Sequence, residues 1–318
     1  MSLFLHAKLY FCNKIESLRG YTAIFILVLF LLHSGCKKKS DPVFGPYTMQ
    51  SIFVNTAVTP TIYTMDAGLG GAILSASGTR YNFPPNALQK DSQRVYGDVQ
   101  VEMAEYLTKS DMIFSGILPY SNGQPFLSAG AFYLNISQNG LPVYISKSTK
   151  YLVTIPQKTL PPMGLQLYLG RPDDTLQSNS VNWQLNTDTS IGSVIWGDSL
   201  VVASDSVHFC NAGLPLDSLN YQSFSVKISA PITTFSDTLV AYAIYDTMNV
   251  VWQMGQSHNH IISENMVPNL PVHFVAFTVI DGYFYGGMLA ARPQNGQTYT
   301  INLSLTSPAA LKHKIDGL

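Results

Sequence analysis

Apolar and polar residues alternate along most of this chain. Val99, Val101 and Met103 fall on one side of an extended segment, while Gln100 and Glu102 fall on the other. This period of two predicts a half-buried β-strand. Comparable segments predict further strands at residues 131–137, 151–155, 165–169, 239–245, 272–280 and 299–306. Because no helical period separates them, we predict an all-β chain built from antiparallel sandwiches.

Turn and capping residues mark where these elements end. Asn139-Gly140 and Asp281-Gly282 each separate two apolar runs. We predict a hairpin at both, because a two-residue hairpin turn needs positive φ at both central positions. A single short helix is predicted at the C-terminus, over residues 308–314. Ser307 can cap it and Pro308 suits its first turn.

The distribution of proline and polar residues predicts two domains. Pro161-Pro162 and the polar stretch 171–180 interrupt the strand pattern near the middle of the chain, as linkers between domains do. We therefore expect two sandwich-like domains, at residues 47–165 and 166–318, with the short helix closing the second.

The N-terminal segment has the pattern of a targeting sequence. Basic residues precede the apolar run Ala23–Leu32, and the small residues Ser34 and Gly35 follow it, directly before Cys36. As a helix this run would rise about 15 Å, which is half of a bilayer core and too short to span it. A basic region, a short apolar region and small residues together predict a secretory signal helix within residues 1–35.

Leu32-His33-Ser34-Gly35-Cys36 resembles the lipobox of bacterial lipoproteins, with His33 in place of the usual aliphatic residue. The resemblance implies cleavage before Cys36 and acylation of its thiol, so that a lipid anchor holds the chain on a membrane. An ordinary signal peptide, or a single marginal anchor, is the alternative. Residues 36–46 would form a polar tether. Its charged start is similar to the tether of lipoproteins from Bacteroidota, which implies an outer-membrane lipoprotein on the periplasmic face or at the cell surface.

The charge balance excludes one class of partner. The chain has 18 Lys and Arg against 19 Asp and Glu, a net charge of −1, and only 12% charged residues. A protein that neutralises phosphates needs a basic surface, so we predict no nucleic-acid partner. Once Cys12 is removed and Cys36 is acylated, Cys210 is the remaining thiol. No internal disulfide is then possible, and stability must come from packing.

Gly70-Gly71-Ala72-Ile73-Leu74 and the following Gly78–Leu88 segment combine paired glycines, a short strand, a glycine turn and a Pro84-Pro85 corner. The combination resembles the opening of the ZU-five domain, which occurs in zonula occludens proteins, netrin receptors and ankyrins. Segments 99–113 and 128–133 extend the similarity toward lipoproteins of Bacteroidota that carry this domain. The resemblance covers about residues 70–160. It implies a β-sandwich at a cell surface that contacts other proteins, and it implies no reaction.

His208-Phe209-Cys210 is the strongest candidate for chemistry. Some ZU-five proteins cut themselves at a His-Phe-Ser site between this domain and the next. By that resemblance, Cys210 would attack the preceding carbonyl in an N-to-S acyl shift assisted by His208, and the chain would break between Phe209 and Cys210. The alternative is a plain strand with a small buried cysteine.

Other patterns predict neither a metal nor a catalytic site. His258 and His260 would share one face of a strand, with Glu264 near in sequence, but zinc takes three or four protein ligands and a polar loop is favoured. No nucleophile elbow, phosphate loop, dinucleotide fingerprint or calcium loop is present in the sequence. We therefore predict no cofactor and no enzymatic activity. A hydrolase with a site built from distant loops is a weaker alternative.

A short motif recurs in the second half of the chain. Asp followed by Ser or Thr and then an aliphatic residue or Met resembles the acceptor for O-glycosylation in exported proteins of Bacteroidota. Asp-Ser and Asp-Thr also begin turns that lead into strands, which is the alternative. The candidate acceptors are Thr175, Ser199, Ser206, Ser218, Thr238 and Thr247.

These patterns together favour a lipid-anchored protein of the cell envelope. The expected role is a non-catalytic module that binds or scaffolds an unidentified protein or glycan partner. A surface protein that cuts itself between Phe209 and Cys210 is the second hypothesis.

Overall fold

The structure is a computed structural model, and it describes residues 46–172, 181–216, 222–229, 239–254, 261–266 and 270–318. It confirms the all-β prediction, because several antiparallel sheets and a few short helices make up these ranges. The signal segment, the start of the tether and Cys36 lie outside the described residues.

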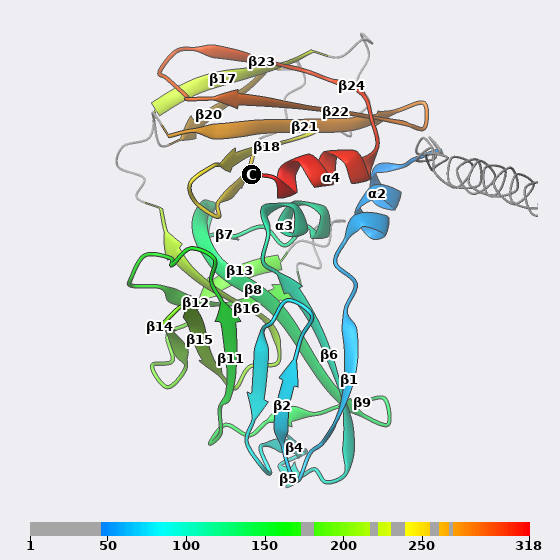
Figure 1. Cartoon of the computed structure of the whole chain (residues 1–318), viewed down its shortest axis with the longest axis vertical. Helices are drawn as coiled ribbons and strands as arrows, with labels where there is room; N and C mark the ends of the chain where they lie inside the picture. Colours follow the sequence, from blue (N-terminus) through cyan, green and yellow to red (C-terminus); the bar gives the residue numbers. More distant parts are fainter. Residues whose placement is uncertain (1–45, 173–180, 217–221, 230–238, 255–260, 267–269) are drawn as a thin grey trace, which may run out of the picture. The chain divides into compact units, whose positions relative to one another are not determined.

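The first sandwich consists of two large sheets (Figure 1). Sheet 1 has the order β1 (Thr61–Asp66), β6 (Asp98–Tyr106), β8 (Gln124–Gln138), β16 (His208–Pro215), β12 (Gln166–Pro172) and β13 (Val181–Leu185), with β7 (Tyr120–Ser121) and β9 (Leu141–Pro142) also paired to β8. Sheet 2 has the order β14 (Gly192–Trp196), β15 (Ser199–Ser204), β11 (Tyr151–Pro156), β3 (Arg80–Phe83) and β2 (Gly71–Leu74). A small additional sheet in this sandwich contains β10 (Tyr144–Ile145), β4 (Leu88–Lys90) and β5 (Gln93–Arg94).

The core of the first sandwich follows the alternation seen in the sequence. Val99, Val101 and Met103 of β6 are buried, and they pack in one cluster with Tyr151 and Val153 of β11 in the facing sheet. Each strand contributes every second residue because successive side chains in a strand point to opposite faces. The period of two was therefore a correct guide to which side of these strands is inside.

The second sandwich packs a three-stranded sheet on a five-stranded one. Sheet 3 has the order β20 (Ile261–Met266), β17 (Gln222–Ser229) and β23 (Thr298–Asn302), and its β17–β23 pairing is parallel. Sheet 4 has the order β19 (Val251–Gln253), β18 (Val240–Tyr245), β21 (Val272–Ile280), β22 (Tyr283–Ala291) and β24 (Ser304–Leu305).

The central strands of sheet 4, β18 and β21, are buried on both faces. Ala241 and Phe274 point toward sheet 3, whereas Ile244 and Phe277 pack against three helices, α2 (Met49–Thr56), α3 (Lys109–Ser115) and α4 (Pro308–Asp316). A sheet covered on both sides needs apolar residues at nearly every position. This explains why β18 is apolar throughout and why His273 and Thr278 are the only polar residues of β21.

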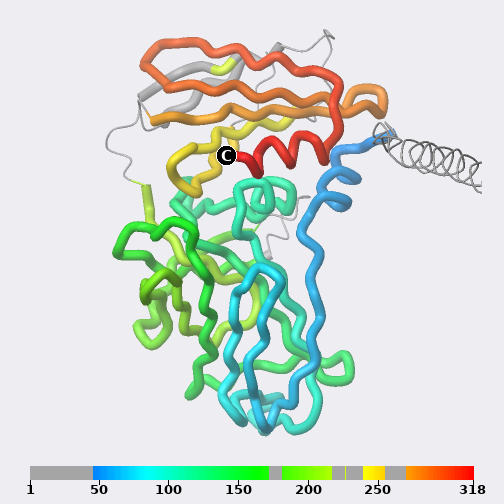
Figure 2. The backbone as a smooth tube through the Cα atoms, viewed as in Figure 1, coloured from blue at the N-terminus to red at the C-terminus, as the bar shows by residue number. Residues whose placement is uncertain are grey.

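The two predicted hairpins are confirmed. Asn139 and Gly140 have φ of 53° and 76° between β8 and β9, and Asp281 and Gly282 have φ of 51° and 79° between β21 and β22. Figure 2 shows the β21–β22 hairpin in orange. Both central residues are left-handed, as this turn requires.

The C-terminal helix is also confirmed, but two other helices were not predicted. In α4, the Ser307 side chain accepts from the Ala310 backbone N–H at 3.1 Å, and Pro308 occupies the first turn. The unpredicted helices are short: α3 has seven residues between the Thr108 cap and Gly116 (φ 70°). So few residues cannot display a helical period in the sequence. None of the three helices in the described ranges has the length and apolarity that a membrane span requires.

The expected domain boundary at residues 165 and 166 does not coincide with the division between the sandwiches. β12 and β16 follow that boundary in sequence, yet β16 pairs with β8 and β12 pairs with β16. The division falls after β16 instead. The Pro161-Pro162 segment joins β11 of sheet 2 to β12 of sheet 1. A loop that crosses between two sheets of one sandwich has the same polar, proline-rich composition as a linker between domains.

Candidate functional site

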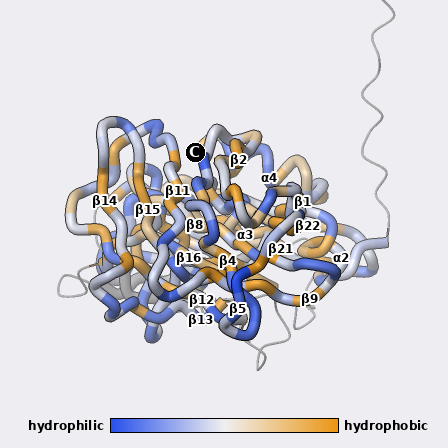
Figure 3. Tube along the Cα trace, turned by 90° about the horizontal axis from the view of Figure 1, so that it is seen from below, coloured by the Kyte–Doolittle hydropathy of each residue, from blue (hydrophilic) through white to orange (hydrophobic). Residues whose placement is uncertain are grey.

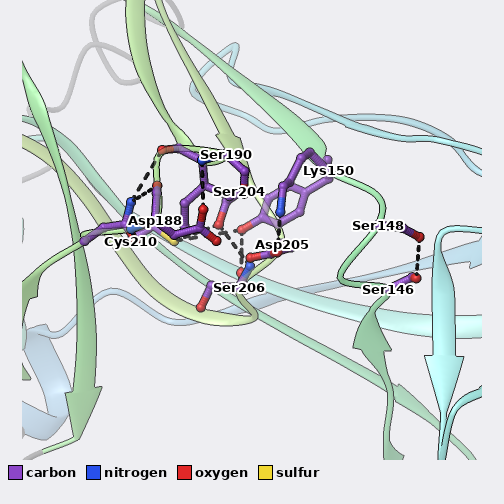
Figure 4. A network of polar contacts seen from close by, with 12 residues as sticks. Ser146, Ser148, Lys150, Asp188, Ser190, Ser204, Asp205, Ser206 and Cys210 are labelled. Atoms are coloured by element: carbon purple, nitrogen blue, oxygen red, sulfur yellow. Dashed lines mark hydrogen bonds and ion pairs between the residues drawn. The ribbon is translucent and has the colours of Figure 1, made fainter.

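Cys210 lies at the centre of the first sandwich. It belongs to β16, where Phe132 of β8 and Leu169 of β12 are its register partners on either side. The side chain is fully buried. Its sulfur lies 3.9 Å from the Tyr151 hydroxyl and 3.8 Å from the Ser204 hydroxyl (Figure 4). The prediction of a small buried cysteine in a strand is confirmed.

The thiol is held in its neutral form. Burial raises the pKa of Cys210 to about 11, although hydrogen bonds with Ser204 and Tyr151 act in the opposite direction. Thiol reactions proceed through the thiolate, so a thiol with this pKa is a weak nucleophile at neutral pH.

Tyr151 connects this buried thiol to the loop that leads into β16. Its hydroxyl donates to the Ser206 carbonyl at 2.7 Å, and its ring stacks on Phe83 with centroids 5.5 Å apart. Burial, followed by the nearby Cys210, raises the pKa of Tyr151 well above its ordinary value. The Ser206 backbone N–H donates to Ser204 at 3.0 Å. The 204–206 corner is therefore fixed by hydrogen bonds on both sides.

A second buried tyrosine faces the same core. The Tyr81 hydroxyl of β3 donates to Glu105 of β6 at 3.1 Å, and Ser77 donates to the other oxygen of this carboxylate. Burial is the main cause that raises the pKa of Tyr81, and the Glu105 charge adds to it. These contacts link sheets 1 and 2 and satisfy the carboxylate, so Glu105 has a structural role here.

His208 occupies a different environment from Cys210. Its backbone has φ of 100°, a conformation that costs free energy for any residue with a Cβ. The side chain is exposed and lines an open hollow of about 630 Å³, together with Asp91, Asp188, Asp205, Lys147 and Tyr144 among others. His208 is therefore exposed although Cys210, two residues along the same strand, is buried.

The hollow is polar and open to solvent. Asp91 has φ of 49°, and Asp205 forms an ion pair with Lys150 (Figure 4). The Asp188 carboxylate accepts from the Ser190 backbone N–H at 2.8 Å, and hydrogen bonds from Ser190 lower its pKa. Within the part of the chain that the structure describes, no group of three His, Cys, Asp or Glu is placed to hold a metal ion.

The proposed self-cleavage site has one supporting and one opposing feature. The strained φ of His208 precedes the Phe209–Cys210 bond, as a strained scissile segment requires. The thiol that must attack is buried and protonated, and its polar contacts are to Tyr151 and Ser204. Cleavage between Phe209 and Cys210 stays a prediction.

The outer face of sheet 2 carries exposed apolar side chains that the sequence did not identify. Leu74, Leu152, Val194 and Trp196 are 67%, 41%, 56% and 78% exposed. They come from β2, β11 and β14, and cross-strand register places Val194 opposite Val201 and Leu152 opposite Ala203. Figure 3 shows apolar positions of β14 and β15 in orange. Exposed Arg80 and Asn82 of β3 lie on the same face between Leu74 and Leu152. Exposed apolar side chains gathered on one face, rimmed by polar ones, mark a place where a partner can bind.

Of the six candidate acceptors for O-glycosylation, three lie within the described residues. Ser199 is half-buried at the start of β15, Ser206 is half-buried at the hollow, and Thr247 is exposed between β18 and β19. Of the three candidate acceptors within the described residues, Thr247 is thus the most accessible. Thr175, Ser218, Thr238, His258 and His260 lie outside the described residues.

No protein-family model and no curated protein matches this chain. The similarity to the ZU-five domain therefore depends on the residues quoted for it.

In the Tyr151→Phe variant, the free energy of unfolding is expected to fall less steeply with rising pH than in the wild type. The unfolded tyrosine releases its proton near pH 10, while the folded one holds it to higher pH. The wild-type free energy of unfolding therefore falls as pH rises above about 10, by about 1.4 kcal/mol per pH unit for this group. Urea titrations between pH 8 and 11 should show a shallower slope in Tyr151→Phe.

Tyr144→Phe is the matched control, because it removes an exposed hydroxyl from the same sandwich. Its slope should equal that of the wild type. A Tyr151→Phe protein with the wild-type slope would mean that Tyr151 is already accessible to hydroxide in the folded state.

Proposed function

We propose that this chain is a lipid-anchored protein of the cell envelope, and that it is a non-catalytic module that binds or scaffolds a partner. The observation that carries the binding role is the exposed apolar face of sheet 2, formed by Leu74, Leu152, Val194 and Trp196. The N-terminal pattern that ends at Cys36 supports the anchor, and the polar tether after it supports display of the folded part away from the lipid.

The construction of sheet 2 suits a preformed binding face. Its inner side chains, among them Tyr81, Val153 and Val202, are fully buried in the sandwich core. Strands fixed by such a core hold outer side chains in place without a partner, so that little conformational entropy is lost on binding. The exposed aromatic Trp196 supplies a large apolar contact of the kind that dominates binding energy at interfaces.

The similarity of residues 70–160 to the ZU-five domain supports the same role. That domain serves contacts between proteins in eukaryotes, and we propose that this chain uses its first sandwich in this way. We favour a protein partner over a glycan, because Leu74, Leu152 and Val194 are aliphatic, and the polar Arg80 and Asn82 of β3 on the same face suit a mixed protein interface.

Self-cleavage between Phe209 and Cys210 is a second candidate, favoured by the left-handed φ of His208. The intact mass of the chain, described in the Discussion, also reports any break at this bond.

Photo-crosslinking in intact native cells tests the binding role. A benzoylphenylalanine at position 152 is expected to give a covalent adduct with a partner, because this position lies in the central strand of sheet 2. Adding Val194→Asp on the same face should abolish the adduct. The absence of any adduct from position 152 would contradict the proposal.

The control probe is at Tyr283, which is similarly exposed but belongs to β22 of the second sandwich. An adduct of the same mass from position 283 would show that the partner does not bind at sheet 2.

A further inference from the structure

β14 ends sheet 2 and has an open edge. Sheet 2 runs from β14 to β2, and β14 pairs with β15 on one side only. Among the described residues, none of the backbone hydrogen bonds outside the regular ladders involves Gly192–Trp196. The outward N–H and C=O groups of this strand are therefore available to another strand.

The sequence of β14 lacks the features that normally prevent pairing at an edge. Natural edge strands carry a charged residue, a proline or a bulge. Gly192–Trp196 contains none of these, and its register with β15 is continuous over all five residues. By contrast, β1 at an edge of sheet 1 includes Asp66. The exposed Val194 and Trp196 would gain burial from a neighbouring strand.

The spacing within β14 makes it complementary to itself. In an antiparallel pair centred on Val194, Trp196 of each copy lies opposite Gly192 of the other, because both are two residues from the centre. Gly192, Val194 and Trp196 share the outer face of the sheet. A Cβ added at Gly192 would meet no atom within 4 Å, so the space above it is open. An aromatic side chain that covers a cross-strand glycine is a known stabilising pair in sheets.

Charge also favours this register. Val194 meets Val194 at the two-fold axis, and Ser193 meets Ile195. Gly192–Trp196 contains no charged residue, so no like charges face each other along the paired strands. A foreign strand would have to match this pattern by chance, whereas a second copy matches it twice by symmetry.

We propose that this protein forms a two-fold symmetric dimer in which β14 of one copy pairs antiparallel with β14 of a second copy, centred on Val194. The two copies of sheet 2 then form one continuous sheet, and the apolar outer face doubles in width. The dimer goes beyond the proposed binding role, and it depends neither on acylation of Cys36 nor on an outside partner.

Sedimentation equilibrium of the full chain in a density-matched detergent tests the dimer. The wild type should dimerise. Val194→Lys places two ammonium groups against each other at the axis, and it should raise the dissociation constant at least about a hundredfold. Trp196→Ala should raise it about tenfold, because both symmetric Trp196–Gly192 contacts are lost.

Leu74→Lys is the matched control. It introduces the same charge at an exposed apolar position of sheet 2, but on β2 at the opposite edge, and it should leave the dissociation constant unchanged. A monomeric wild type at about 100 µM, or a dimer that Leu74→Lys dissociates and Val194→Lys does not, would overturn the proposal.

Cysteine cross-linking tests the register itself. Residues directly opposite in an antiparallel pair have Cα atoms about 4.5–5.5 Å apart, which suits a disulfide. Val194→Cys should therefore give an oxidised dimer, while Leu74→Cys should give only the background of the wild type. A Val194→Cys protein that dimerises without forming this cross-link would exclude the register centred on Val194.

Discussion

Replacing Cys36 with alanine is expected to abolish fatty acylation completely. In the proposed anchor this thiol accepts the acyl chains, so its loss removes the acceptor. We then expect no cleavage before residue 36, and residues 1–35 should remain attached. The intact mass of wild-type protein from membranes should correspond to residues 36–318 with acyl chains. The mass of Cys36→Ala should correspond to residues 1–318 without them. Incorporation of a labelled fatty acid provides an independent readout.

Cys12→Ala is the matched control, because it removes a cysteine that lies before the proposed cleavage site. This variant should be acylated like the wild type. A wild-type mass that retains residues 1–35, or that lacks acyl chains, would contradict the anchor and favour an ordinary signal peptide or a marginal membrane anchor. A fragment that ends at Phe209 would establish self-cleavage instead of an intact chain.

Gly70→Ala is expected to reduce the free energy of unfolding by about 3–5 kcal/mol. Gly70 has φ of 65°, and a Cβ there would lie 2.4 Å from the Phe83 carbonyl oxygen and 2.8 Å from Pro84 backbone atoms. The variant thus combines a left-handed alanine with a clash against the backbone. Urea denaturation of the full chain, followed by tryptophan fluorescence, measures the loss.

Gly78→Ala separates the two contributions. Gly78 also has positive φ, at 88°, but the nearest atom to an added Cβ is Pro156 Cγ at 3.6 Å, an ordinary contact. The cost there should be about 1–2 kcal/mol, from the backbone conformation alone. If both variants lose the same free energy of unfolding, the close approach of Gly70 to the Phe83–Pro84 corner does not contribute to stability.

The close approach of Gly70 to the Phe83–Pro84 backbone also gives a physical reason why a glycine occurs at the start of the motif that ends in Pro84-Pro85. The paired glycines and the Pro84-Pro85 corner are separated in the chain, yet the backbone at Gly70 touches the corner directly. The resemblance to the ZU-five opening thus includes a packing requirement. A side chain at position 70 would push this corner away from the turn.

Much of the secondary structure was predictable because its signals are local. The period of two in β6, the Asn139-Gly140 and Asp281-Gly282 turns and the Ser307 cap each involve residues a few positions apart. Helix α3 was missed although Thr108 and Gly116 mark its ends, since seven residues between them show no period.

Strand partners were not predictable, because pairing joins residues far apart in sequence. β16 lies between β8 and β12, and no pattern within His208–Pro215 specifies β8 as its neighbour. The misplaced domain boundary has the same origin. The period of two would also give His208 and Cys210 the same environment, yet His208 is exposed and Cys210 is buried, which the sequence pattern does not reveal.

The sequence by itself determined that this protein is built mainly from antiparallel strands, where several of its turns lie and how its C-terminal helix begins. Only the tertiary structure decided which apolar side chains are covered. Trp183 and Trp196 both occur in short strands, but Trp183 is fully buried and donates to the Leu118 carbonyl at 2.8 Å, whereas Trp196 is 78% exposed. A strand fixes the alternation of its faces through its own geometry, but which face meets solvent depends on what the rest of the chain packs against it.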